Sequence, residues 1–252
     1  MKNKMMMFGL ALCMLPMCLH ATTGESGKEA YQSGEPIPAG TILPVSLNSS
    51  LRSGKSGSGA AITATVMQDV PLGAGKTLRA GSKVTGHVIE ASAPGKGSDE
   101  PRISFQFDQV RFENRMVPIT TNLRAVASVM EVETAQVPRT GEDGESEGSW
   151  SLVPIGGDQV GTRDAGEECR GVVDGNSGVP ALWLFSADAC GAYGLGNLQI
   201  LHSGHTAPVG EVTLTANGKA VKVGRGSAML LRVNGSEAEA QAPATLSRGI
   251  AQ

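Results

Sequence analysis

Five stretches of the chain alternate between apolar and polar residues, and this pattern limits the possible fold more than any other feature. They are residues 43–47, 62–66, 84–88, 103–107 and 117–121. A period of two predicts β-strands with one buried and one solvent-exposed face. Glycine-rich turn signals separate the stretches, and strands at this spacing are typical of an antiparallel sandwich or barrel. The sequence therefore predicts an all-β fold, either an antiparallel β-barrel or a β-sandwich.

More strands are expected in the last third of the chain. The apolar run at 181–185 does not alternate and predicts a fully buried strand. Three further candidates alternate or are short, namely residues 198–201, 211–215 and 220–223. Asn217-Gly218 lies between the last two, and this dipeptide predicts a hairpin that joins them. Residues 229–233 form the last predicted strand.

Composition supports this fold class and excludes several kinds of protein. The chain has 252 residues, of which 34 are Gly, and this glycine content is about twice the average. The hydrophobic share of 40% argues against wholesale disorder. The formal charge of −3 argues against a nucleic-acid partner, because such proteins normally present a basic stripe.

The N-terminus is typical of a secretory signal peptide. Lys2 and Lys4 precede an apolar run from Met5 to Leu19, and Ala21 follows as a small residue before the chain turns polar. The run is too short for a comfortable membrane span. We expect cleavage after Ala21, a periplasmic or secreted location, and no transmembrane helix in the mature chain. Two alternatives are a lipid anchor on Cys18 and an uncleaved membrane anchor.

The mature chain divides into three parts by composition. Residues 22–36 are polar and predict a flexible leader, and residues 37–235 predict the β-domain with an insertion at about 125–210. Within the insertion, the acidic Gly/Ser run at 141–148 predicts an exposed loop. A cation site there is the alternative, although the spacing matches no calcium-binding loop. Residues 236–252 predict a disordered tail.

Removal of the signal peptide would leave Cys169 and Cys190 as the only cysteines of the mature chain. In an oxidising compartment an even pair of cysteines predicts a disulfide. A loop of about 20 residues closed in this way should gain roughly 3 kcal/mol in the chain-entropy model. A pair of metal ligands or a reactive thiol are the alternatives.

Several short motifs occur in a characteristic order along the chain. The first is Ile37-Pro38-Ala39-Gly40-Thr41, and Ala64-Thr65-Val66 and Arg79-Ala80-Gly81-Ser82 follow it. Val221 to Val233 completes the series. Gly40 and Gly81 are expected to have positive φ in turns before strands.

This series resembles the periplasmic β-barrel domain of the conjugal-transfer TrbI-like family, over about residues 36–123 and 211–234. That resemblance implies a β-barrel that serves as a component of a type IV secretion channel in the cell envelope. Family members also carry an N-terminal membrane helix and an apolar helical hairpin, whereas this chain has a signal-like start and an acidic insertion. The chain also resembles exported proteins of environmental bacteria.

No catalytic residues or cofactor are predicted, because the chain lacks G-x-S-x-G, H-E-x-x-H and phosphate-loop motifs. His202 and His205 are candidate metal ligands, and a metal centre would need further ligands such as His87 or Glu211. Surface imidazoles are the simpler interpretation of these histidines.

Trp150 and Tyr193 are flanked by Gly and Ser and are expected to be exposed, where they could form a sugar-binding platform. The leading hypothesis is a non-enzymatic, exported envelope β-barrel that acts through contacts with envelope proteins or with itself. One alternative is a glycan- or ligand-binding β-sandwich. The other is a secreted hydrolase, for which a metal ion bound by His202 and His205 is one form of the hypothesis.

Overall fold

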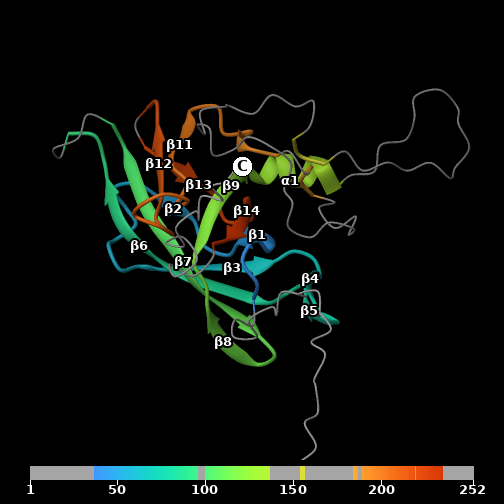
Figure 1. The fold of residues 1–252 in the computed structure, drawn as a ribbon. Coiled ribbons are helices and arrows are strands. Elements are labelled where there is room, and N and C mark those ends of the chain that lie inside the picture. The colour runs from blue at the N-terminus through green and yellow to red at the C-terminus, as the bar shows by residue number, and fades with distance from the viewer. Residues whose placement is uncertain are drawn as a thin grey trace, which may run out of the picture. The chain divides into compact units, whose positions relative to one another are not determined.

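The computed structural model describes residues 37–95, 100–136, 154–156, 184–186, 189–218 and 220–234. Figure 1 shows that strands dominate this part of the chain and that its one helix is short. The elements are β1 (Ile42–Leu47), β2 (Leu51–Arg52), β3 (Ala61–Val66), β4 (Val70–Gly73), β5 (Lys76–Leu78), β6 (Lys83–Ser92), β7 (Arg102–Phe112), β8 (Arg115–Pro118), β9 (Thr121–Ala127), α1 (Val129–Gln136), β10 (Gly191–Tyr193), β11 (Leu198–His202), β12 (Val212–Ala216), β13 (Lys222–Val223) and β14 (Ala228–Val233). Strands make up 52% of the structure, which confirms the predicted all-β class.

The main sheet curls into a nearly closed barrel. Its strand order is β10-β9-β14-β1-β3-β6-β7-β12-β11, and β8 is added beside β7. The pairing is antiparallel except between β9 and β10, which run parallel. Of the two architectures that the alternation predicts, the barrel is therefore the one observed.

The two end strands of the sheet, β10 and β11, come together on the same side of β9. β10 pairs with the second half of this strand, from Ala125 to Ala127. β11 returns beside β10, and the next residue, Ser203, accepts a 2.8 Å hydrogen bond from the backbone N–H of Leu123. β9 thus has backbone partners on both sides. Part of the predicted insertion at about 125–210 therefore contributes to the barrel wall itself.

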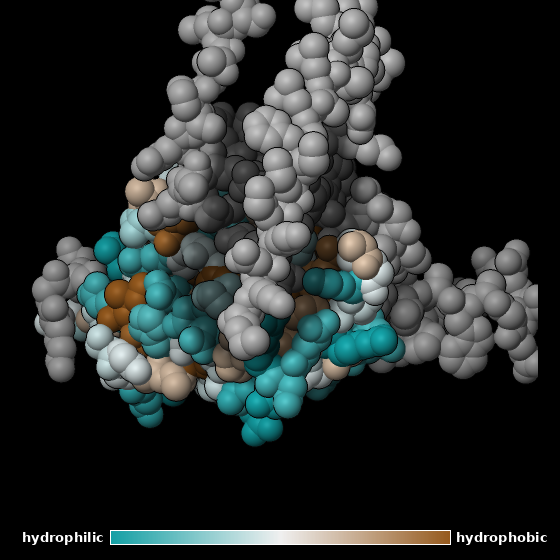
Figure 2. All heavy atoms as spheres, turned by 60° about the horizontal axis from the view of Figure 1, so that its bottom comes forward, coloured by the Kyte–Doolittle hydropathy of each residue, from teal (hydrophilic) through white to brown (hydrophobic). Residues whose placement is uncertain are grey.

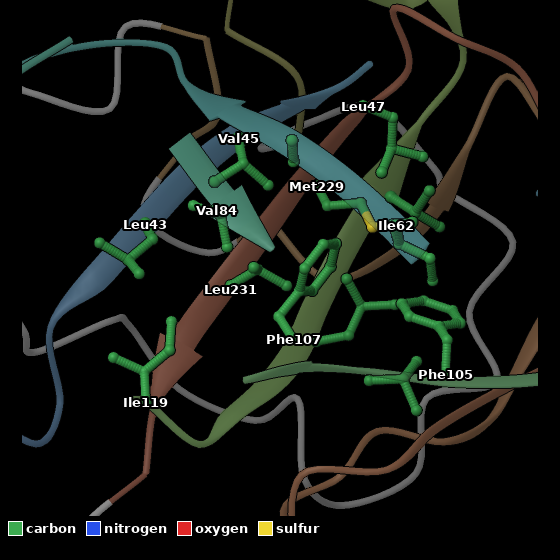
Figure 3. Packing of buried hydrophobic residues seen from close by; sticks show 14 of the residues in the cluster. Leu43, Val45, Leu47, Ile62, Val84, Phe105, Phe107, Ile119, Met229 and Leu231 are labelled. Atoms are coloured by element: carbon green, nitrogen blue, oxygen red, sulfur yellow. The ribbon is translucent and has the colours of Figure 1, made fainter. Parts of the chain in front are cut away.

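Apolar side chains fill the barrel interior. β1, β3 and β14 turn their alternating residues inward, as the period of two predicts (Figure 3). Phe105 and Phe107 of β7 lie among them, with ring centroids 5.8 Å apart and planes at 82°. Both rings are essentially inaccessible to solvent, at 0% and 1% exposure. The interior is thus a packed core.

The long strands β6 and β7 come unusually close at Gly86. This glycine lies opposite Phe107, next to a shift in the register of the two strands. A Cβ at position 86 would lie only 1.9 Å from the carbonyl oxygen of Gln106 and 2.8 Å from the Cα of Phe107. Only glycine permits this approach of two backbones, which places Phe107 in the core.

A short two-stranded ribbon continues the β1–β14 ladder. Leu47 donates its backbone N–H to Ser227 and accepts one from Gly226, and after an irregular step β2 pairs with β13. Leu51 and Val223 pair on the buried face of this ribbon. Their neighbours Arg52 and Lys222 also pair, on its outer face.

A second apolar cluster lies outside the barrel. It contains residues from β1, β9, β14, β10 and α1, together with Ile155, Leu184, Phe185 and Ala189. β9 and β14 are consequently buried almost throughout their length. Leu184 and Phe185 fall in the strand predicted at 181–185. Among the described residues, however, only a parallel bridge between Ile155 and Phe185 is formed there.

The helix α1 was not predicted from the sequence. The Ser128 hydroxyl accepts a 3.3 Å hydrogen bond from the backbone N–H of Glu131, which caps the N-terminus of the helix. Val132 and Ala135 are its buried residues. In the described part of the chain, no helix has the length and apolar character needed to cross a bilayer.

The hairpin predicted at Asn217-Gly218 is wrong. β12 pairs with β11 and β7, whereas β13 pairs with β2 in a separate sheet. The N–H of Asn217 bonds instead to the carbonyl of Asn197, 2.9 Å away. Burial of Val212 and Leu214 between two strands of the barrel therefore outweighs the local turn preference.

Other turn predictions are confirmed. Gly40 and Gly81 have φ values of 82° and 83°. The turn between β7 and β8 has positive φ at both central residues, Glu113 and Asn114, as a two-residue type I′ hairpin requires. The stretch predicted at 117–121 belongs to two strands, because β8 ends at Pro118 and β9 begins at Thr121.

Asp69 fastens the β4–β5 hairpin to the chain that follows it. Its carboxylate accepts hydrogen bonds from the backbone N–H of Ala80 and from the Arg79 guanidinium, each 2.8 Å long. The bond from Ala80, followed by that from Arg79, lowers the pKa of Asp69 below its ordinary value. Both bonds are stronger when the carboxylate is ionised.

Replacement of Asp69 by asparagine should make the free energy of unfolding less dependent on pH in the acidic range. A lowered folded-state pKa stabilises the fold above the unfolded-state pKa, and this contribution is lost as pH falls through the folded-state pKa. We therefore expect the urea midpoint of the native protein to exceed that of Asp69→Asn at neutral pH and to converge with it in acid. Glu133→Gln, at an exposed position on α1, is the control and should follow the native curve. A constant difference between Asp69→Asn and the native protein across this range would contradict the assignment.

Candidate functional site

The two candidate metal-binding histidines lie at the end of β11 and in the loop after it. The His202 Nε2 lies 3.2 Å from the carbonyl oxygen of Pro208. His205 is exposed, and its backbone N–H donates to the Ser203 hydroxyl at 3.4 Å. Within the described ranges, no group of three or more His, Cys, Asp or Glu side chains is arranged to hold a metal ion. The structure thus adds no third ligand to this pair.

His87 is engaged elsewhere. Its Nδ1 lies 3.0 Å from a carboxylate oxygen of Asp108, and each side chain is 39% exposed. The pair lies across β6 and β7, on the face opposite the core. A histidine oriented by a carboxylate is one part of a catalytic triad, but the contacts of this pair with described residues include no serine or cysteine nucleophile. The His87–Asp108 contact therefore links β6 and β7 on their outer face.

The prediction that Tyr193 is exposed is wrong. Its side chain is 6% exposed and belongs to the cluster outside the barrel. The phenolic oxygen accepts a 2.9 Å hydrogen bond from the backbone N–H of Cys190. Gly191 and Gly194, with φ values of 93° and 63°, bend the chain on either side of it. The neighbouring glycines therefore shape the backbone around a buried ring.

Every aromatic residue in the described part of the chain is buried, namely Phe105, Phe107, Phe112, Phe185 and Tyr193. Flat exposed rings are the usual platforms on which sugars and bases stack. Trp150, the other candidate for a sugar platform, lies outside the described residues. The glycan-binding alternative therefore receives no support from the barrel.

Cys190 directly precedes β10, and Tyr193 holds its backbone N–H. Cys169, the acidic run at 141–148 and Cys18 lie outside the described residues, as do residues 1–36 and 236–252. The Cys190 position is therefore fixed against the barrel wall beside β9.

A group of cations on the β2–β13 ribbon was missed by sequence reasoning. It consists of Arg52, Lys55, Lys222 and Arg225, which we call the basic ribbon. Lys55, Lys222 and Arg225 are exposed and Arg52 is half-buried. The ion pairs found between described residues, Asp69–Arg79 and His87–Asp108, involve none of them. These four side chains therefore present positive charge to solvent.

Two of these cations face each other directly. Arg52 lies opposite Lys222 in the register of β2 and β13. The N–H of Ser53 donates to the carbonyl of Val221 at 3.1 Å, which makes the adjacent Arg52–Lys222 pair the narrow, non-hydrogen-bonded kind. Like charges in such a pair destabilise a sheet. The arrangement therefore costs stability.

The backbone of the ribbon is closed on one edge and open on the other. On β2, the N–H of Arg52 donates to the Ser56 hydroxyl at 3.1 Å, and its carbonyl accepts from Lys55 and Ser56. On β13, Val221 uses its N–H and carbonyl for Ser53, so those of Lys222 point away from β2. No partner for them exists among the described residues.

Exposed apolar side chains are few and scattered. The large ones are Met116, Met130, Leu201 and Val209, and none belongs to β2 or β13. Figure 2 shows one face of the molecule, on which separate hydrophobic areas are set among hydrophilic residues. Single exposed apolar residues are normal on a protein surface. Among the described residues, exposed apolar side chains therefore indicate no docking surface.

Comparison with known proteins identifies no family. No family model matches the chain, and no curated protein matches it.

Proposed function

We propose that the chain is exported and acts in the cell envelope as a non-catalytic β-barrel module through contacts with other proteins. The packed interior is the observation that carries this proposal. Phe105, Phe107 and Met229 fill the barrel with no more than 1% exposure. Barrels that carry a ligand leave room inside for it, so binding by this barrel falls to its outer surface.

The sequence supplies the location. A basic start, a 15-residue apolar run and Ala21 support cleavage of a signal peptide. The motifs shared with the TrbI-like family support an envelope role related to secretion. Acylation of Cys18 remains the alternative form of the mature protein, and intact-mass measurement distinguishes it by the added lipid.

The proposal is tested in the native host. We expect the mature protein to begin at Thr22, to fractionate with the periplasm or envelope, and to form specific cross-linked products with envelope proteins or with itself. Controls are a cytoplasmic marker and the same chain without residues 2–21. A protein that stays in the cytoplasm, or that remains a monomer without partner after mild cross-linking, would count against the proposed function.

We also propose that Cys169 and Cys190 form a disulfide in the exported protein. Because Tyr193 fixes the backbone at Cys190, such a bond would tie the segment that carries Cys169 to the wall of the barrel. Unreduced, denatured mature protein should therefore contain no free thiol. Cys169→Ser should lower the free energy of unfolding by roughly 3 kcal/mol. Two free thiols in the unreduced native protein would refute the bond.

A further inference from the structure

The basic ribbon carries its charge at a cost to the fold. Arg52 and Lys222 occupy opposite positions on an outer face where one acidic residue would have made a favourable pair. Lys55 and Arg225 add positive charge in the turns at the two ends of the ribbon. Cations on a strand edge also discourage aggregation, but that role does not require a second cation directly opposite the first.

The open edge of β13 adds a second kind of recognition. The N–H and carbonyl of Lys222 face away from β2, beside the side chains of the ribbon. An extended peptide placed along this edge could bond to both groups, as in recognition by strand addition. Carboxylates on such a peptide would lie near the cations.

A polypeptide fits this surface better than the other polyanions of an envelope. Binding to an anionic membrane usually joins cations with apolar side chains that insert, and β2 and β13 expose no large hydrophobic residue. An extended peptide can pair its backbone amides with the N–H and carbonyl of Lys222, a match that a glycan chain lacks.

The geometry points to the basic ribbon as the docking surface for an extended, acidic segment of a partner protein. This inference rests on the proposed function, because it assigns the surface through which the module makes its protein contacts. Arg52, Lys55, Lys222 and Arg225 supply the positive charge, and the backbone of Lys222 supplies one donor and one acceptor. Binding is electrostatic and therefore falls as salt is raised.

The test is a charge reversal that separates binding from stability. The probe is a fluorescently labelled peptide of glutamates, and the same peptide made of glutamines is its neutral counterpart. The mature native protein should bind the acidic probe, and Lys222→Glu should weaken that binding about tenfold or more. The urea midpoint of Lys222→Glu should equal or exceed the native one, because Arg52 then faces an opposite charge.

Arg115→Glu is the matched control. Arg115 is an exposed cation on β8 and lies next to the turn of the β7–β8 hairpin. It forms no ion pair with described residues. It should leave probe binding within about twofold of the native value. Equal weakening by both reversals, or unchanged binding by Lys222→Glu, would overturn the site.

Anionic vesicles and an anionic polysaccharide replace the probe in two further measurements. Tighter binding of either one than of the glutamate peptide, lost on Lys222→Glu, would reassign the ribbon to that partner. Cross-linked partners that persist in cells with Lys222→Glu would keep the proposed function while rejecting this surface.

Discussion

Replacement of Phe107 by alanine should lower the free energy of unfolding by about 3–5 kcal/mol, the usual cost of removing a fully buried aromatic ring. The side chain is 1% exposed and packs edge-to-face against Phe105. The strands around it belong to a nearly closed, hydrogen-bonded wall, so we expect only partial collapse into the space that is left. Urea denaturation of the mature protein measures the change.

Two variants bracket this expectation. Phe107→Leu keeps most of the apolar volume and should lose clearly less stability than Phe107→Ala. Met116→Ala changes a side chain that is 39% exposed on β8 and should stay within about 0.5 kcal/mol of the native value. If Phe107→Ala resembled Met116→Ala, the interior would be loosely filled, which would contradict a function confined to the outer surface.

Replacement of Gly86 by alanine should have the second largest effect, at least about 2 kcal/mol, although it adds only one methyl group. The new Cβ would meet the backbone at Gln106 and Phe107, and backbone atoms cannot rotate away as a flexible side chain can. β6 and β7 would have to separate locally, and the ladder between them is the longest in the barrel.

Gly57→Ala is the matched control for this substitution. A Cβ at position 57 meets nothing within 4 Å, and the residue lies in an exposed turn. Alanine there should be neutral or should stabilise by up to about 1 kcal/mol, by restricting the unfolded chain. Similar losses at both positions would contradict the close approach of the two backbones as the cause of the effect at Gly86.

Four strands of the barrel were predictable because apolar and polar residues alternate along their sequences. β1, β3, β6 and β7 coincide with alternating stretches, and their inward residues form the core. The closure of the barrel was not predictable, because it depends on Ser203 reaching Leu123 across a long separation in the sequence. Periodicity reports which face is buried and contains no information on the partner strand.

The helix α1 had a sequence signal that alternation cannot reveal. Ser128 and Glu131 have the spacing of a capping box, which marks a helix start. Only Val132 and Ala135 are buried beyond this cap, so the helical period is too short to stand out. The burial of Tyr193 was not predicted for another reason. Its glycine neighbours are typical of an exposed loop.

The basic ribbon had no local signal at all. Arg52 and Lys222 are far apart in the sequence, and each by itself resembles an ordinary surface cation. Their juxtaposition follows from the register between β2 and β13, which is set by the burial of Leu51 and Val223. By contrast, His202 and His205 were singled out by their spacing in the sequence, but spacing alone could not show that no group of three or more ligands forms among the described residues.

The pairing of β1 with β14 has a consequence for the biosynthesis of the protein. Ile42 lies opposite Arg232, so this ladder joins the first strand of the barrel to the last. β14 lies between β1 and β9 in the sheet. A growing chain that has not yet reached Ala228 therefore leaves both of these strands without a partner on one side. Such open edges readily pair with other chains. The edges of β1 and β9 therefore stay unpaired until the segment that forms β14 has been synthesised.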